Sequence, residues 1–190
     1  MAYFEDLSEY GYFPHHCRSG SRNVGWLEQG HEFDRAAPSS EVLELLWSYC
    51  KISVMQARGF HRCDLCAPPH PCVISARNGS GLRVGSAEIR VFSAAGDAYA
   101  APNLIYHYVR THWYKPPEEF LRAMREGARP PSSEYFESLN KLVDFGWKET
   151  LIHPGDTRDS VPEMSGSRFE RADGEVRRVA VQIPVHLDQD

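Results

Sequence analysis

The feature that most restricts the fold of this chain is a pair of cysteines, Cys63 and Cys66, followed at once by the proline-rich segment 67–71. Two thiolates at this spacing can reach one Zn2+ ion from a tight turn, at about 2.3 Å each. A redox-active pair of the thioredoxin type stands at the start of a helix, and the prolines after Cys66 disfavour a helix there. Two buried free thiols are the other alternative. The pair therefore predicts half of a zinc site on a loop.

The other half of such a site requires two more nitrogen or sulfur ligands, and the best candidates are His107 and His112. Their spacing lies within the range of zinc sites, and both fall on a predicted helix. Residues five apart are separated by about 140° around a regular helix, so the helix must loosen near 110–112 for both rings to meet one ion. His112 also lies in the apolar stripe of that helix, where a hydrogen-bonded core histidine is the alternative. The substitute ligands near the cysteine pair are His61, His70 and Cys72.

The cysteine content also bears on the compartment. There are five cysteines, an odd number, and three of them lie beside histidines between residues 63 and 72, which favours metal ligation in a reducing compartment over disulfides. The start of the chain lacks the build of a signal peptide, and no stretch approaches the ~20 apolar residues that cross a bilayer. We therefore expect a cytoplasmic protein with no membrane partner. Cys17 and Cys50 fit small core hydrophobes, and segment 15–17 is a second, weaker metal candidate.

Length and charge limit the classes of partner. The 190 residues fit one domain with appendages, at ~100–200 residues per domain. They carry 21 Lys and Arg against 26 Asp and Glu, a formal net charge of −5. Duplex nucleic acid requires a basic face, and single strands require stacking aromatics interleaved with cations. The tyrosine-rich segment 99–114 has only Arg110 and Lys115 close by, so nucleic acid is disfavoured as a partner.

Hydrophobic periodicity predicts four helices. The first follows a cap at residues 38–41 and buries the stripe Val42, Leu45, Leu46 and Tyr49. The second has Pro102 at its first position and ends before the prolines at 116–117. The third opens at the same prolines and ends at Gly127, and the fourth is capped by Ser132 or Ser133.

Between residues 72 and 100 the period changes to two, which predicts a small antiparallel meander with a turn at 78–81. Residues 23–27 form a candidate edge strand. Charged and apolar side chains alternate over 87–91, so Glu88 is expected on the solvated face. The fold class is therefore α+β: a small antiparallel sheet with packed helices. A knuckle, a hairpin and then a helix with two ligands is the order of elements in treble-clef zinc modules, so the knuckle is predicted to be treble-clef-like.

The composition changes near residue 150. We expect a zinc-binding α+β domain over 1–150, and a loop or linker with a C-terminal β-hairpin over 151–190. Segment 152–167 holds two prolines, two glycines and few apolar residues, which predicts a long loop. Residues 177–185 alternate behind an Asp-Gly turn at 173–174, which predicts the hairpin.

Several motifs resemble those of an uncharacterised bacterial protein family, a domain of unknown function. They are Asn23-Val24-Gly25-Trp26-Leu27 with Gly30-His31, segment 58–66 with its Arg-Gly-x-His-x-Cys-x-x-Cys pattern, Gly85-Ser86-Ala87-Glu88-Ile89-Arg90-Val91, segment 99–109, and segment 116–120. The resemblance covers about residues 1–126. It implies a small soluble bacterial protein and adds weight to the motif residues, but it implies no particular activity.

These observations support two functional hypotheses. In the first, a structural zinc ion held by Cys63, Cys66, His107 and His112 stabilises a module that acts by binding another protein, because four protein ligands close the coordination shell. In the second, only three ligands are real and the protein is a hydrolase-type zinc enzyme, whose metal-bound water is activated by Glu88 or Glu32.

No catalytic signature supports the enzyme. In a zinc deaminase a residue would separate His31 from Glu32, and a proline would stand in place of Arg62 before the first cysteine. Phosphate-binding loops, nucleophile elbows and His-Glu-x-x-His helices are also absent from the sequence. No catalytic residue is assigned.

Overall fold

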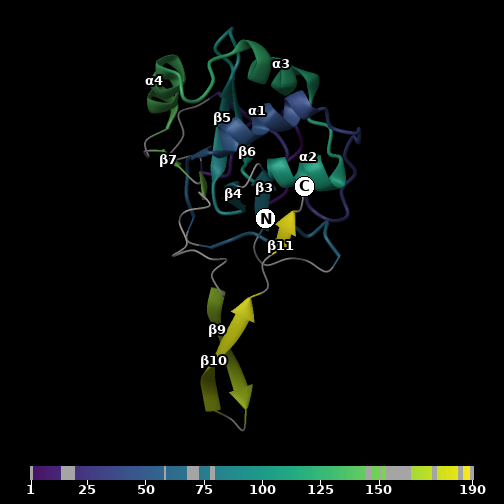
Figure 1. Cartoon of the computed structure of the whole chain (residues 1–190), viewed down its shortest axis with the longest axis vertical. Coiled ribbons are helices and arrows are strands. Elements are labelled where there is room, and N and C mark those ends of the chain that lie inside the picture. Colours follow the sequence, from purple (N-terminus) through teal and green to yellow (C-terminus); the bar gives the residue numbers. More distant parts are fainter. Residues whose placement is uncertain are drawn as a thin grey trace.

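The computed structural model describes residues 2–13, 20–57, 59–67, 73–77, 80–143, 147–149, 151–152, 164–172, 175–183 and 186–188. Within them the fold is α+β (Figure 1). The helices are α1 (Ser40–Cys50), α2 (Ile105–His112), α3 (Glu118–Glu126) and α4 (Ser133–Leu142). The strands are β1 (Ser21–Asn23), β2 (Ile52–Ser53), β3 (Val73–Arg77), β4 (Ser80–Val84), β5 (Glu88–Phe92), β6 (Ala98–Pro102), β7 (Lys148–Glu149), β8 (Leu151–Ile152), β9 (Met164–Ala172), β10 (Glu175–Ile183) and β11 (His186–Asp188).

The central sheet has three strands in the order β1-β6-β5. β5 and β6 are antiparallel, but β1 runs parallel to β6, so the sheet is mixed and the prediction of an antiparallel sheet holds only in part. The predicted edge strand at 23–27 begins and ends earlier, as β1. Backbone pairing continues one step further, because the amide of Val24 donates to the carbonyl of Ala100.

The predicted meander is divided between two sheets. β3 and β4 form a hairpin in a separate four-stranded sheet of order β11-β3-β4-β8, and β4 does not pair with β5. Gly85 separates β4 from β5 with a φ of +101°, a conformation that favours glycine. The chain turns there, and the first residue of β5, Glu88, pairs with Val54.

The core lies between the central sheet and the helices, since α1, α3 and α4 all contact β5. The predicted stripe of α1 is buried, and Ser39 caps that helix by accepting from the amide of Val42. Ser132 caps α4 in the same way, and Gly127 follows the end of α3, as predicted. The second helix differs from its prediction, because Pro102 is the last residue of β6 and α2 begins only at Ile105.

The opposite face of the sheet is covered by the N-terminal segment. A small cluster of Tyr10, Trp26 and Ala100 packs there, with Phe4 and Tyr12 at its edge. All five residues of β5 are buried, so the expectation that Glu88 faces solvent is wrong: its exposed fraction is 2%. The alternation over 87–91 is therefore between two covered faces.

Beyond residue 147, two short strands return to the sheet that contains β3 and β4. β8 pairs with β4, and β11 pairs with β3. β9 and β10 pair as an antiparallel hairpin, in the stretch for which the alternation predicts one (Figure 1). The predicted loop over 152–167 ends earlier than expected, because residues 164–167 belong to β9. Residues 153–163 of that loop lie outside the residues that the structure describes. The domain boundary near residue 150 stays a prediction.

None of the helices in the described ranges has both the length and the apolar character needed to cross a membrane.

Candidate metal centre

Two cysteines and two histidines converge where the loop over 59–67 meets α2. Their ligand atoms all lie within 4.8 Å of one another. The Cys63 Sγ atom lies 3.2 Å from Nε2 of His112, and the Cys66 Sγ atom lies 3.3 Å from Nε2 of both His107 and His112. The structure thus brings together the four residues that spacing selected, and a metal ion could be held between them.

The size of this group fits a tetrahedral zinc shell. With Zn–S bonds of about 2.3 Å and Zn–N bonds of about 2.0–2.1 Å, a tetrahedron places sulfur and nitrogen about 3.6 Å apart. The observed sulfur-to-nitrogen distances of 3.2–3.3 Å differ by only a few tenths of an ångström. A small adjustment of the side chains would therefore admit the ion.

Gly85 and Asn103 fix the loop against α2. The amide of His61 donates to the carbonyl of Gly85 at 2.7 Å, and the amide of Gly85 donates to Oδ1 of Asn103 at 2.6 Å. A Cβ atom at Gly85 would stand 2.7 Å from the carbonyl oxygen of His61, so no larger residue fits this approach. Since Asn103 lies two residues before the start of α2, these bonds set the distance from the cysteine loop to the helix that carries the histidines.

The end of α2 explains how two histidines five residues apart can meet. His112 is the last residue of the helix, and Trp113 after it adopts a left-handed conformation with a φ of +58°. The helix therefore ends where the prediction required it to loosen. His107 is fully buried, whereas His112 is half-buried and contacts both cysteines, which argues against a purely core role for it.

Groups around the cluster suit a bound cation. The Oγ1 atom of Thr111 lies 3.3 Å from Nδ1 of His107, so a proton on Nδ1 would leave the Nε2 lone pair to face Cys66. The amides of Leu65 and Cys66 donate to the sulfur of Cys63, which favours its thiolate. Burial nevertheless raises the pKa of Cys63 to about 12, so the protein without metal holds a neutral thiol there. Binding of a cation would displace that proton.

The sequence analysis does not predict a role for Thr111 or for the two loop amides. The position of Thr111, one helical turn after His107, is the one feature of the sequence that indicates a contact between the two side chains.

Comparison with known proteins gives one match. The model of a family described as a domain of unknown function (DUF7919) matches residues 2–125, more than half of the chain. The chain belongs to this family. The match confirms the family resemblance carried by the sequence motifs, and all four cluster residues lie inside the DUF7919 domain. Searches of curated proteins and of solved structures return no match.

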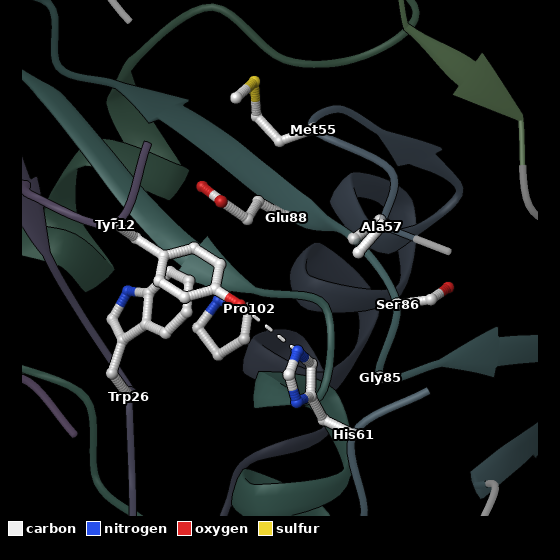
Figure 2. Close-up of a pocket in the computed structure, with 10 residues that line it drawn as sticks. Tyr12, Trp26, Met55, Ala57, His61, Gly85, Ser86, Glu88 and Pro102 are labelled. Atoms are coloured by element: carbon white, nitrogen blue, oxygen red, sulfur yellow. Dashed lines mark hydrogen bonds between the residues drawn. The ribbon is translucent and has the colours of Figure 1, made fainter. Parts of the chain in front are cut away.

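The other candidate ligands in the sequence lie away from the cluster or outside the residues that the structure describes. The Nε2 atom of His61 lies 3.3 Å from the hydroxyl of Tyr12, toward which its ring points (Figure 2), and His61 does not join the cluster. Cys50 is buried in the core as expected, with its Sγ 3.6 Å from the carbonyl oxygen of Asn103. His70, Cys72 and segment 15–17 lie outside the described residues.

Neither proposed general base belongs to the cluster. Glu32 is exposed. Glu88 accepts hydrogen bonds from the hydroxyl of Tyr10 and from Nη1 of Arg90, at 2.6 Å for the latter. Burial is the main cause of the raised pKa of Glu88, and Arg90 and Tyr10 oppose it.

The tyrosines of segment 99–114 in the DUF7919 domain do not form a surface for stacking bases. Tyr99, Tyr106, Tyr108 and Tyr114 are all at most 3% exposed. Trp113 is exposed, but a single aromatic ring is not the interleaved platform that single strands require.

Proposed function

We propose that the DUF7919 domain binds one Zn2+ ion through Cys63, Cys66, His107 and His112, and that the ion stabilises the fold. The observation that carries this proposal is the convergence of two sulfur and two nitrogen atoms from segments that are 41 or more residues apart in the chain. Mixed thiolate and imidazole ligands in a tetrahedral arrangement favour zinc over hard cations such as Mg2+ or Ca2+.

The order of elements supports a treble-clef-like architecture for the site. The cysteine loop comes first, the β3–β4 hairpin follows, and α2 later supplies the two histidines. The β5–β6 hairpin lies between β4 and α2, so the arrangement is treble-clef-like in its ligand order and more elaborate in its connection.

A closed shell favours a structural role over a catalytic one. Four protein ligands leave no position for the water that a hydrolytic zinc ion activates. The two carboxylates considered as general bases are absent from the cluster. We therefore propose that the domain acts by binding another protein, and that the zinc ion maintains the surface it presents.

Metal analysis tests the zinc site directly. Protein purified without added metal should contain about one zinc per chain, as expected for one site. Cys63→Ser should lose most of it, while Cys50→Ser, a buried cysteine outside the cluster, should retain it. Replacement of zinc by Co2+ should give the absorption of a tetrahedral thiolate site. A fully folded protein without metal would refute the proposal.

The binding role needs a separate test. In-cell cross-linking should recover a partner with the wild-type chain and with Cys50→Ser, and lose it with Cys63→Ser. Equal recovery with Cys63→Ser would show that the partner contacts a part of the chain that does not depend on zinc.

A further inference from the structure

The hairpin of β9 and β10 lies outside the residues that the family model matches. Its two nine-residue strands form a separate two-stranded sheet. Figure 1 shows this hairpin reaching away from the helices and from the central sheet. An isolated two-stranded hairpin is at best marginally stable in water, and a third strand or a packed face normally stabilises it. No further strand of the described chain pairs with this hairpin, so pairing with a strand of another chain would stabilise it.

We propose that β9 pairs with β9 of a second copy of this chain, which joins two hairpins into one four-stranded antiparallel sheet. The edge of a strand offers a row of N–H and C=O groups to another strand. Addition of a strand at such an edge is a recurring mode of association. A two-fold axis relates the two identical strands, so every favourable pair of residues is formed twice.

The sequence of β9 is self-complementary when two antiparallel copies are centred on Phe169. In this register, Arg168 lies opposite Glu170 of the second copy, and Glu170 lies opposite Arg168 of the second copy. Phe169 lies opposite Phe169, and residues 166–172 of each strand remain paired. Opposite charges and aromatic residues at directly opposed positions both stabilise a sheet.

Other registers of the same strand are less favourable. A centre at residue 168 places two arginines opposite each other, and a centre at residue 170 does the same with two glutamates. Like charges at directly opposed positions are destabilising. A register with Glu170 opposite Arg171 keeps only residues 169–172 paired. The charges of β9 therefore favour the register centred on Phe169.

The free edge of β10 is less suited to pairing with itself. Its charged residues, Glu175, Arg177 and Arg178, all lie in the first half of the strand. A register that placed Glu175 opposite either arginine of a second copy would pair only residues 175–178. The edge of β9 is therefore the one that fits a second copy.

The pairing inside each hairpin also supports this arrangement. Glu170 is opposite Arg177 in the β9–β10 register, and Arg168 is opposite the uncharged Val179. In the proposed sheet, Glu170 has a cation at the opposed position on either side, one from its own chain and one from the second copy. The second copy also supplies the opposite charge at the position of Arg168.

Sedimentation velocity on the full chain as purified tests the dimer directly. We expect an equilibrium between monomer and dimer that shifts toward monomer as the salt concentration rises, because the opposed pairs are charged and lie at an edge. A chain that stays monomeric across the accessible range of protein concentrations would overturn the proposal. The hairpin shares no residue with the metal cluster, so this failure would leave the proposed zinc site unaffected.

Three variants locate the contact. Arg168→Glu and Glu170→Arg should each raise the dissociation constant of the dimer about tenfold or more, because each places like charges opposite each other at two positions. A mixture of these two variants should associate as the wild type does, since one strand then carries two acidic residues opposite two basic ones. Arg171→Glu makes the same change of net charge but lies opposite Ser167 of the second copy, so it should leave the dimer intact.

Equal weakening by Arg168→Glu and Arg171→Glu would overturn the proposal. A mixture of Arg168→Glu and Glu170→Arg that fails to associate would do so as well. A wild-type dimer that neither variant weakens would place the contact elsewhere in the chain, which also contradicts the proposal. If Arg168→Glu does not fold, the salt dependence and the contrast between Glu170→Arg and Arg171→Glu still decide.

Discussion

The DUF7919 domain contains two buried polar groups that differ in what would stabilise them. In the cluster of Cys63, Cys66, His107 and His112, all four members are side chains of the kind that ligate metals. In the second group, the carboxylate of Glu88 meets the guanidinium of Arg90 at 2.6 Å, so the chain provides both charges. Under the proposed zinc site, the first group is stabilised by an ion from solution, whereas the second is stabilised by charges of the chain itself. The two should respond differently to removal of metal, to substitution and to pH.

The largest expected effect is loss of the metal. Structural zinc contributes apparent binding free energies of about 10–16 kcal/mol in zinc-finger peptides, and 1 kcal/mol shifts the Tm of a chain of this size by about 2–4 °C. Cys63→Ser should therefore lower the Tm by more than about 10 °C and increase dye binding to exposed apolar surface. Chelation should bring the wild-type chain to the same Tm. Cys50→Ser should keep its response to chelator, which separates loss of a ligand from loss of a buried thiol.

The two histidines refine that experiment. His107→Ala and His112→Ala should each reduce zinc content and Tm as Cys63→Ser does, because each of the four residues is a proposed ligand. If one of them leaves both quantities unchanged, that residue is not a ligand. The site is then open or uses His61 or Cys72 in its place, and the enzyme hypothesis becomes stronger than the structural one.

The next largest effect concerns the second group. Glu88→Ala should lower the free energy of unfolding by about 3–5 kcal/mol, since removal of one partner leaves a buried charge uncompensated. The zinc content should stay at the wild-type level, as measured by element analysis. Loss of zinc in this variant would show that the two groups are coupled, and the contrast between them would fail.

The contrast also explains what the sequence could and could not predict. The members of the cluster were predictable because their spacing is local: two cysteines on one turn and two histidines on one helix. The approach of one pair to the other depends on Gly85 and Asn103, whose roles appear only in the fold. The sequence predicted that the helix loosens near 110–112, but not that Trp113 takes a left-handed conformation, because a bulky side chain rarely does so.

The environment of Glu88 was not predictable from its neighbours. Alternation over 87–91 normally marks one solvated face of a strand. Here the second face is covered by Tyr10 and Trp26, which lie more than sixty residues earlier in the chain. By contrast, the stripe of α1 and the caps of α3 and α4 are local features, and they were predicted correctly.

A smaller effect is expected around the zinc ligands. Thr111→Val should weaken zinc binding by about 10–100-fold, the usual range for partners of a metal-bound histidine, because it removes the contact to Nδ1 of His107. Thr111 is exposed, so the fold should remain intact. Thr111→Ser keeps the hydroxyl and should bind zinc as the wild type does; competition with a chromophoric chelator measures all three. An equal loss in both variants would show that the hydroxyl alone does not account for the effect, because Thr111→Val keeps the methyl group that Thr111→Ser removes.

The smallest effect is the pH dependence that Glu88 adds to stability. Burial raises the pKa of Glu88 above its ordinary value despite the opposing influence of Arg90 and Tyr10. Between the ordinary pKa and the raised one, the folded chain therefore binds more protons than the unfolded chain, so the contribution of Glu88 to stability falls as the pH rises through this window. The slope cannot exceed about 1.4 kcal/mol per pH unit for one proton.

In the Glu88→Gln variant, residue 88 cannot titrate. Subtracting the free energy of unfolding of this variant from that of the wild type at each pH between 4 and 7 therefore isolates the contribution of Glu88 to the pH dependence. Other groups, such as Asp6, whose pKa is also raised by burial, contribute to both chains and cancel. We expect a difference that declines with rising pH. A difference that increases instead would mean that Arg90 holds the pKa of Glu88 below its ordinary value. The pair would then be a fully ionised salt bridge. The second group would be stabilised by its own two charges, in contrast to the cluster, whose proposed stabilisation comes from a bound ion.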